Sequence, residues 1–287
     1  MLTQMGGTNM SKQHTQLNKR VAVITGGSGV LCSEMAKELA RQGVNVAILN
    51  LNPSKGQAVV DEIEAAGGTA IAISVNVLDK QSLINARTTI IEKYGKISIL
   101  INGAGGNHPD AITANEESID VTDGKTFFDL KEDGFSHVFN LNFTGTFLAC
   151  QVFGEVMLEA EAPTIINISS MSGYTPLTKV PAYSAAKAAI GNFTEWLAVH
   201  FAKDGLRVNA IAPGFFVTEQ NRDLLIGKDG EYTARSKKIL AATPMNTFGE
   251  PHHLLGALLF LADESYSSFV TGATIPVDGG FNAYSGV

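Results

Sequence analysis

A tyrosine and a lysine are spaced one helical turn apart in the segment Tyr183-Ser184-Ala185-Ala186-Lys187. Positions i and i+4 of a helix share one face, so the phenol and the ammonium group are expected to lie side by side. A free tyrosine loses its proton near pH 10, but a cation about 4 Å away is worth roughly 4 kcal/mol at an effective dielectric constant near 20. That corresponds to about three pKa units as an upper figure, so the pair could transfer a proton near neutral pH. Such pairs also occur on ordinary helix surfaces, so the surroundings must decide.

Polar residues at the ends of several predicted strands strengthen the case for chemistry. Ser170 follows the apolar segment 164–168, and Asn102 follows segment 97–101. Pro213 and Gly214 follow segment 206–211, with Thr218 four residues beyond the glycine. Ligands of open α/β sheets bind outside the carboxyl ends of the strands, so these residues are expected to meet there.

A glycine-rich turn, Gly26-Gly27-Ser28-Gly29, separates the first predicted strand from the first predicted helix. Glycines in this position allow backbone N–H groups to approach a pyrophosphate at the positive end of the helix. The turn therefore predicts dinucleotide binding, although a purely structural turn is the plainer alternative. Cys32 stands where the usual signature has a glycine. Cys32 is interpreted as a packed residue rather than a reactive thiol, and Cys150, in an apolar helical segment, as a core residue.

The end of the second predicted strand is expected to choose between the two nicotinamide cofactors. An acidic residue there would bind the ribose of NAD, whereas an arginine would bind the 2′-phosphate of NADP. The chain has Asn50-Leu51-Asn52 instead, with Lys55 as the nearest cation. Both NAD(H) and NADP(H) stay open, and the absence of arginine favours NAD(H) slightly.

Alternating strands and helices must position these residues. Short apolar segments with β-branched residues predict strands, and longer segments with helical spacing predict helices. The fold class is therefore α/β, a single doubly wound Rossmann domain with a mainly seven-stranded parallel sheet and helices on both faces. The strands are predicted at 20–25, 44–49, 69–75, 97–101, 164–169, 206–211 and 274–277, and the helices at 31–41, from 53, at 81–94, within 130–159, at 182–203 and at 251–262.

Two connections are much longer than is usual between a strand and a helix. Both leave carboxyl ends of strands, so residues 105–130 and 218–250 are predicted to be substrate loops. Residues 1–18 are polar and predict a flexible extension, which leaves 19–287 as one nucleotide-binding domain.

Composition excludes several other classes of protein. The 287 residues carry a formal net charge of −7, with 45% hydrophobic and 17% charged residues. Disorder, nucleic-acid binding and membrane binding are therefore not expected, and no apolar stretch is long enough to span a bilayer. Two cysteines can build neither a disulfide framework nor a four-thiolate zinc site, so no metal is assigned and a reducing cytoplasm is the expected location.

Together these residues resemble the short-chain dehydrogenase/reductase family over positions 19–280. The motifs stand in the family's order, ending with Asp278-Gly279-Gly280. Departures from the family pattern are Val30 and Cys32 for glycines, Gly103 for an asparagine, Asn76 for an aspartate, and Asn50 at the position that selects the cofactor.

The resemblance implies a role for each member of a catalytic set. Tyr183 would protonate the carbonyl oxygen as hydride arrives, and would act as the base in reverse. Lys187 would lower the pKa of Tyr183 and hold the nicotinamide ribose. Ser170 would orient the substrate oxygen, and Asn142 would position a water that links Lys187 to solvent.

The resemblance also implies the residues that contact the cofactor. Thr218 would bind the nicotinamide carboxamide, and Asn102 and Val77 would line the adenosine side. The full set is Gly26, Gly27, Ser28, Gly29, Val30, Leu31, Asn50, Asn76, Val77, Asn102, Gly103, Ala104, Tyr183, Lys187, Pro213, Gly214, Phe216 and Thr218.

Within the family, the chain is similar to the D-mannonate oxidoreductase (fructuronate reductase) group through the segments 26–31, 105–109 and 111–128. A sugar-acid carboxylate needs a local cation in an acidic protein. Arg222 is the first candidate, with Lys228, Arg235, Lys179 and His108 behind it, and each is otherwise a solvated surface residue. Asn107 and His108 are candidates for binding sugar hydroxyls.

Two other functions stay open at this point. One is reduction of another carbonyl, in a polyol, a sugar or a 3-ketoacyl thioester. The other is a cofactor-binding sensor without turnover, although such a sensor would not need the complete set of Ser170, Tyr183, Lys187 and Asn142. The family's tetramers bury apolar helix surfaces, and the apolar segment 254–261 makes a homotetramer the expectation by resemblance.

Overall fold

Seven parallel strands form one sheet in the order β3-β2-β1-β4-β5-β6-β7, which confirms the predicted doubly wound fold. The computed structural model describes residues 14–118, 124–218, 222–228 and 230–286. Each predicted strand is present, with bounds within two residues of those expected. The strands are β1 (Val21–Thr25), β2 (Asn45–Asn50), β3 (Thr69–Ser74), β4 (Ile99–Asn102), β5 (Thr164–Ile168), β6 (Arg207–Pro213) and β7 (Thr274–Val277).

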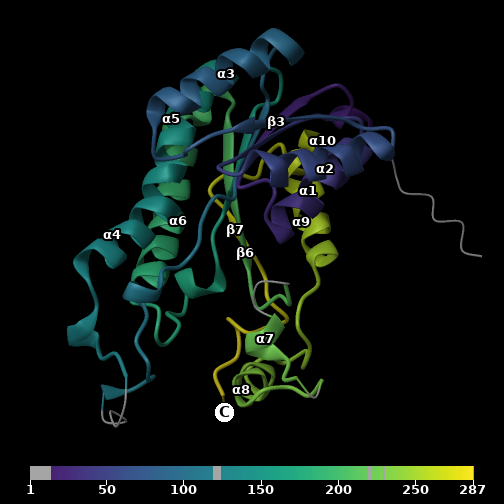
Figure 1. Cartoon of the computed structure of the whole chain (residues 1–287). Helices are drawn as coiled ribbons and strands as arrows, with labels where there is room; N and C mark the ends of the chain where they lie inside the picture. Colours follow the sequence, from purple (N-terminus) through teal and green to yellow (C-terminus); the bar gives the residue numbers. More distant parts are fainter. Residues whose placement is uncertain (1–13, 119–123, 219–221, 229, 287) are drawn as a thin grey trace, which may run out of the picture.

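Helices cover both faces of this sheet (Figure 1). One face carries α3 (Lys80–Tyr94), α5 (Gly145–Met157) and α6 (Pro181–His200). The other carries α1 (Val30–Arg41), α2 (Pro53–Ala65) and α9 (Leu255–Ala262). The short helix α10 (Glu264–Ser267) follows α9.

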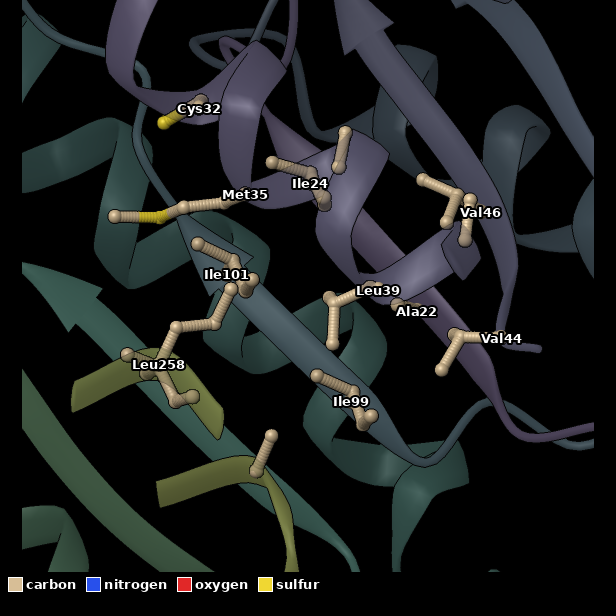
Figure 2. Packing of buried hydrophobic residues seen from close by; sticks show 14 of the residues in the cluster. Ala22, Ile24, Cys32, Met35, Leu39, Val44, Val46, Ile99, Ile101 and Leu258 are labelled. Atoms are coloured by element: carbon tan, nitrogen blue, oxygen red, sulfur yellow. The ribbon is translucent and has the colours of Figure 1, made fainter. Parts of the chain in front are cut away.

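The central strand β1 is apolar throughout because its two faces enter different cores. Ala22 and Ile24 pack with α1 and α9, whereas Val21 and Val23 pack with α3 and α5. Figure 2 shows the first of these cores, where Met35 and Leu39 of α1 meet the strands and Leu258 of α9. A strand that is buried on both faces consists of consecutive apolar residues, which explains the uninterrupted apolar segment of β1 in the sequence.

Local signals in the sequence fix where several helices begin and end. The Asn52 side chain accepts hydrogen bonds from Ser54 N and Lys55 N, and Pro53 occupies the first turn of α2. Helix α3 ends at Gly95, whose φ of 83° favours glycine. These caps hold the helices in register with the strands that carry the site.

Both long connections lie at one end of the sheet, beyond the carboxyl ends of the strands (Figure 1). The first runs from β4 to α4 (Glu132–Phe139) and contains the short turns η2 (Pro109–Ala111) and η4 (Phe127–Asp129). The second, predicted only as a loop, contains α7 (Arg222–Leu225) and α8 (Ala234–Ala241) before η8 (Pro251–Leu254). Ile239 and Leu240 of α8 form a small core with Leu225 and Phe248, which explains why this segment is helical.

The folded part begins before the predicted boundary at residue 19. Residues 1–13 of the predicted extension lie outside the described residues. Leu17 is fully buried in the core beside α1, and His14 Nδ1 lies 2.7 Å from Asp263 Oδ2. Residues 14–18 therefore belong to the domain rather than to a loose extension. In the described part of the chain, no helix has the length and apolar character needed to cross a bilayer.

Candidate active site

A cavity of about 290 Å³ opens at the carboxyl ends of β1, β4, β5 and β6. It collects residues that are far apart in the sequence, as the doubly wound topology requires. The predicted residues that line it are Gly26, Gly29, Val30, Leu31, Gly103, Asn142, Ser170, Tyr183, Lys187, Pro213, Gly214 and Thr218.

Helix α6 presents Tyr183 and Lys187 to this cavity, as their spacing predicted. Lys187 Nζ donates a hydrogen bond of 2.8 Å to the backbone oxygen of Ile168, at the end of β5. The same nitrogen lies 5.5 Å from the centroid of the Tyr183 ring. Tyr183 packs against a small cluster of Ala111, Val138 and Ala182, so its ring is held by the first long connection and by α4.

Burial dominates the electrostatics of this pair and corrects the expected direction for Tyr183. Desolvation raises the pKa of Tyr183 above its ordinary value, and a hydrogen bond from Ser170 opposes that rise. Desolvation also lowers the pKa of Lys187 to about 8. The predicted lowering of the Tyr183 pKa by Lys187 does not appear, because burial of the phenol has the larger effect and the lysine nitrogen is bonded to Ile168 O. The phenol is therefore protonated near neutral pH, which suits a proton donor.

Replacing Lys187 by methionine is expected to stabilise the fold at neutral pH. The pKa of Lys187 in the fold, about 8, lies below its ordinary 10.5. Below pH 8 both the folded and the unfolded chain hold the proton, so the burial penalty is fully present, at about 3 kcal/mol. Between pH 8 and 10.5 the unfolded chain binds more protons, so this group's contribution to the free energy of unfolding rises with pH. Denaturant unfolding of Lys187→Met should give a gain of about 1–3 kcal/mol at pH 7.

That gain should shrink as the pH rises toward 10, where the wild-type lysine is neutral in the fold. The exposed Lys55→Met serves as the matched control and should show no such pH-dependent difference. A Lys187→Met protein less stable than wild type at pH 7, or a difference that is independent of pH, would contradict this prediction.

Asn142 lies in a π-helical turn, Asn140–Thr144, between α4 and α5. It is fully buried, and its Nδ2 donates 2.8 Å hydrogen bonds to both Gly106 O and Val138 O. Its Oδ1 accepts from Gly106 N at 3.4 Å. Asn142 therefore ties the segment after β4 to the helix, and π-turns of this kind are frequent at functional sites.

Gly105 leaves an open space between Asn142 and Lys187. A Cβ at position 105 would lie 2.5 Å from Asn142 Oδ1 and 3.6 Å from Lys187 Nζ. Gly105 and Gly106 line the cavity, although sequence reasoning gave them no role beyond their place in the predicted substrate loop 105–130. The glycine cluster after β4 was the available signal, because glycines there permit close approach of polar groups.

The turn after β1 has the form that a pyrophosphate requires. Gly26 has a φ of 64°, and a Cβ there would lie 2.8 Å from both the N and the Cα of Ala104. Gly29 precedes the first turn of α1, a helix of twelve residues that starts at Val30 and opens toward the cavity. The backbone of Gly26 and Gly29 and the N-terminus of α1 thus face the cavity, an arrangement that fits the pyrophosphate of a dinucleotide.

Cys32 and Gly103, two departures from the family pattern, pack directly against each other. A Cβ at position 103 would overlap the Cys32 sulfur and lie 3.1 Å from Thr25 O. Cys32 is 5% exposed, and burial raises the pKa of its thiol to about 11. The structure therefore confirms a packed cysteine, and it links two substitutions that looked independent in the sequence.

Several other predicted cofactor residues lie outside the cavity lining. The Asn102 side chain is buried, where its Nδ2 donates to Cys150 Sγ at 3.2 Å and to Asn167 Oδ1 at 2.9 Å. Asn102 and Cys150 thus belong to the core between the sheet and α5. The remaining ones are Gly27 against β2, Ser28, Asn50, exposed Asn76, Val77 against Gly145, Ala104 against Gly26, and Phe216 in the core.

Asn50 lies at the end of β2, the position that was expected to choose between the two cofactors. Its side-chain nitrogen donates to the backbone oxygen of Asn52. Its Oδ1 is buried and accepts no hydrogen bond from any residue in the described part of the chain. This oxygen faces Gly56 of α2, where a Cβ would lie 2.5 Å from it, so in this conformation it is closed to a ribose hydroxyl.

The predicted substrate residues are not brought to the cavity. His108 Nδ1 accepts a hydrogen bond of 3.2 Å from Asp110 N, and Asn107 Oδ1 accepts one from His108 N. Asp110 is in turn paired with Lys125 at 3.0 Å. Arg222 is exposed at the start of α7. None of the three lines the cavity.

Residues 20–228 match the family model described as short chain dehydrogenase. The chain belongs to the short-chain dehydrogenase family. The chain is 65% identical, over 96% of its length and 99% of the relative, to "Uncharacterized oxidoreductase UxuB" of Bacillus subtilis. It is 32% identical, over 93% of its length and 98% of the relative, to a 3-oxoacyl-[acyl-carrier-protein] reductase of a Synechocystis species.

A solved structure with bound NAD is similar to this chain throughout. It comes from Haemophilus influenzae and is assigned provisionally as a D-mannonate oxidoreductase. The identity is 53% and the TM-score 0.93, with 96% of this chain and 99% of the other covered. The short-chain dehydrogenase chain described here is thus an oxidoreductase of a family that uses NAD(P).

Proposed function

We propose that this oxidoreductase interconverts D-fructuronate and D-mannonate, or a similar keto sugar acid and its alcohol, with NAD(H). The observation that carries the proposal is the likeness to the Haemophilus influenzae structure, which holds NAD and is provisionally a D-mannonate oxidoreductase. The two chains are 53% identical, and the likeness extends over 96% of this chain and 99% of the other. The segments 105–130 and 218–250 are proposed to be the substrate loops, because Gly105, Gly106 and Thr218 at their starts line the cavity.

When bound, the nicotinamide cofactor supplies or accepts the hydride. In reduction, Tyr183 donates its proton to the carbonyl oxygen while the carbonyl carbon gains the hydride, which yields a secondary alcohol. Ser170 orients that oxygen by a hydrogen bond. Its Oγ is held in place by accepting from Ser172 N at 3.1 Å. The raised pKa of Tyr183 keeps this proton on the phenol until the carbonyl oxygen becomes basic.

Lys187 and Asn142 would restore the proton on Tyr183. Lys187 lies against the phenol ring, and its pKa of about 8 allows it to exchange protons near neutrality. The space over Gly105 between Asn142 and Lys187 is where a water would complete a path to solvent. Lys187 would also hold the nicotinamide ribose, and Thr218 would hold the carboxamide; both residues line the cavity.

The connection after β2 supports the preference for NAD(H). No arginine follows β2 before α2, so this connection has no guanidinium to bind the 2′-phosphate of NADP(H).

A panel of substrates, each assayed with both cofactors, tests the proposed function. The panel holds D-mannonate, a second aldonate, D-fructuronate, the neutral polyol D-mannitol, the ketose D-fructose and a 3-ketoacyl thioester. The highest kcat/KM is expected for D-fructuronate and D-mannonate, with NAD(H) preferred over NADP(H). Turnover of neutral alcohols alone would exclude a sugar acid, and turnover of the thioester alone would favour the alternative suggested by the 3-oxoacyl relative. NADH binding without turnover of any member would favour a sensor.

We further propose a homotetramer. Large apolar side chains are exposed on α6 (Trp196, Val199) and near β7, where Phe269 is fully exposed. Phe260 of α9 is 37% exposed. Sedimentation equilibrium should give four chains per particle; a monomer would contradict this proposal.

A further inference from the structure

We propose that the substrate carboxylate binds Arg235 and Lys179 in a second cavity, which adjoins the catalytic one. This inference rests on the proposed function, because it names the part of that site that would recognise a sugar acid. It replaces Arg222, the first candidate from the sequence, with two cations that the fold brings together.

The second cavity has a volume of about 390 Å³ and lies between α8 and the loop that precedes α6. Phe215, in its wall, directly follows Pro213 and Gly214, which line the catalytic cavity. Lys179 stands four residues before Tyr183. Neighbouring residues on two separate segments therefore line the two cavities, and the proposed substrate extends from Tyr183 into the second.

The cations of this cavity are not equivalent. Lys238 Nζ lies 3.2 Å from Glu116 Oε1, so its charge is balanced by the first long connection. Arg235 and Lys179 have no carboxylate within 4 Å among residues 14–118, 124–218, 222–228 and 230–286. In a chain with a net charge of −7, two uncompensated cations at one cavity create a local attraction for an anion.

The backbone of Lys179 is held in an unusual conformation. Its φ of 71° lies in the left-handed region, which residues with a Cβ rarely adopt. The carbonyl of Lys179 accepts a hydrogen bond of 3.0 Å from Thr113 N, and Leu177 N donates to Ser184 Oγ at 3.2 Å. The first long connection and α6 thus fix the loop, and with it the position from which the lysine side chain leaves the backbone.

The other residues that line the second cavity suit the carbon chain of a sugar acid. Phe215, Phe281 and Ile239 supply apolar walls, against which the carbon chain can lie. Arg235 carries a planar guanidinium that can bond both oxygens of a carboxylate, and Lys179 adds a point charge. Arg222 lines neither this cavity nor the catalytic one.

Steady-state kinetics of Arg235→Gln and Lys179→Gln test the assignment on matched pairs of substrates. The pairs are D-fructuronate with neutral D-fructose, and D-mannonate with neutral D-mannitol. Each variant should raise KM for the acid by about tenfold or more, because a charge-assisted bond is lost, and should change kcat little. KM for the neutral partner should stay within about twofold, and Arg235→Lys should recover part of the affinity for the acid.

Lys237→Gln, an exposed cation on the same helix that does not line the cavity, is the matched control, with Arg222→Gln beside it. Neither should change KM for the acid. The wild-type KM for the acid should also rise with salt, and the double variant Lys179→Gln/Arg235→Gln should lose that dependence.

Two results would overturn the carboxylate assignment and leave the proposed function intact. One is an unchanged KM for the acid in the double variant, and the other is an equal rise for acid and neutral substrates. Wild-type turnover of neutral sugars with none of sugar acids would instead refute the proposed function, and the assignment with it.

Discussion

The variant Tyr183→Phe is expected to lower kcat for carbonyl reduction by about 10²- to 10⁴-fold. The substitution removes one oxygen, and with it the only group at the cavity that the proposal asks to donate a proton to the substrate. The ring stays packed against Ala111, Val138 and Ala182, so the fold is not expected to change. Stopped-flow measurement of NADH oxidation gives the rate, and fluorescence titration gives the Kd for NADH, which should change by no more than about threefold.

Tyr174→Phe is the matched control for this experiment. Tyr174 lies near the same site, but its hydroxyl donates to Thr274 O at 3.0 Å and it does not line the catalytic cavity. The control should retain wild-type kcat. Carbonyl reduction by Tyr183→Phe at the wild-type rate would show that the proton comes from elsewhere, and the mechanism proposed above would be wrong.

The second large effect is expected at Gly103, where even one methyl group has no room. In Gly103→Ala the new Cβ would overlap the Cys32 sulfur, which lies in the first turn of α1. Overpacking of a dense site costs about 1–3 kcal/mol, and displacement of this turn should weaken NADH binding. Urea unfolding should show a lower free energy of unfolding, and an NADH titration should show a higher Kd.

The double variant Cys32→Gly/Gly103→Ala tests whether this clash is the cause. Removal of the sulfur should restore a large part of both the stability and the NADH affinity, with a coupling energy above about 0.5 kcal/mol. Gly256→Ala is the control, because a Cβ at that helical glycine meets nothing within 4 Å. Additive effects of the two substitutions would show that Cys32 and Gly103 do not compensate for each other.

The sequence predicted the sheet, and that Ser170, Tyr183 and Lys187 meet at its edge, because both depend on local patterns. Strand β1 is continuous and apolar, and Tyr183 and Lys187 are one helical turn apart. Strand ends then place Ser170 and Gly103 at the same edge through topology alone.

The features that sequence reasoning missed depend on contacts between distant segments. The direction of the Tyr183 pKa follows from burial, which no spacing reveals. The contact between Cys32 and Gly103 joins α1 to the end of β4. Arg235 lines the second cavity and Arg222 does not, which depends on the path of the second long connection. Helix α8 forms there because Ile239 and Leu240 pack in a small core. Burial and the path of a loop depend on tertiary contacts, which can override the local propensities that a sequence reveals.

The π-turn at Asn142 sets the rotation of one helical segment against the next. An α-helix advances about 100° per residue, so the extra residue of a π-turn offsets α4 from α5 by about that angle. Helix α5 directs Ala149 and Phe153 to the sheet, whereas α4 directs Val138 to Ala111 and Ala182 beside Tyr183. A single-residue deletion within Asn140–Thr144 would rotate Val138 away from Tyr183 while α5 stayed on the sheet. The extra residue of the π-turn thus allows α5 to pack on the sheet while α4 packs beside Tyr183.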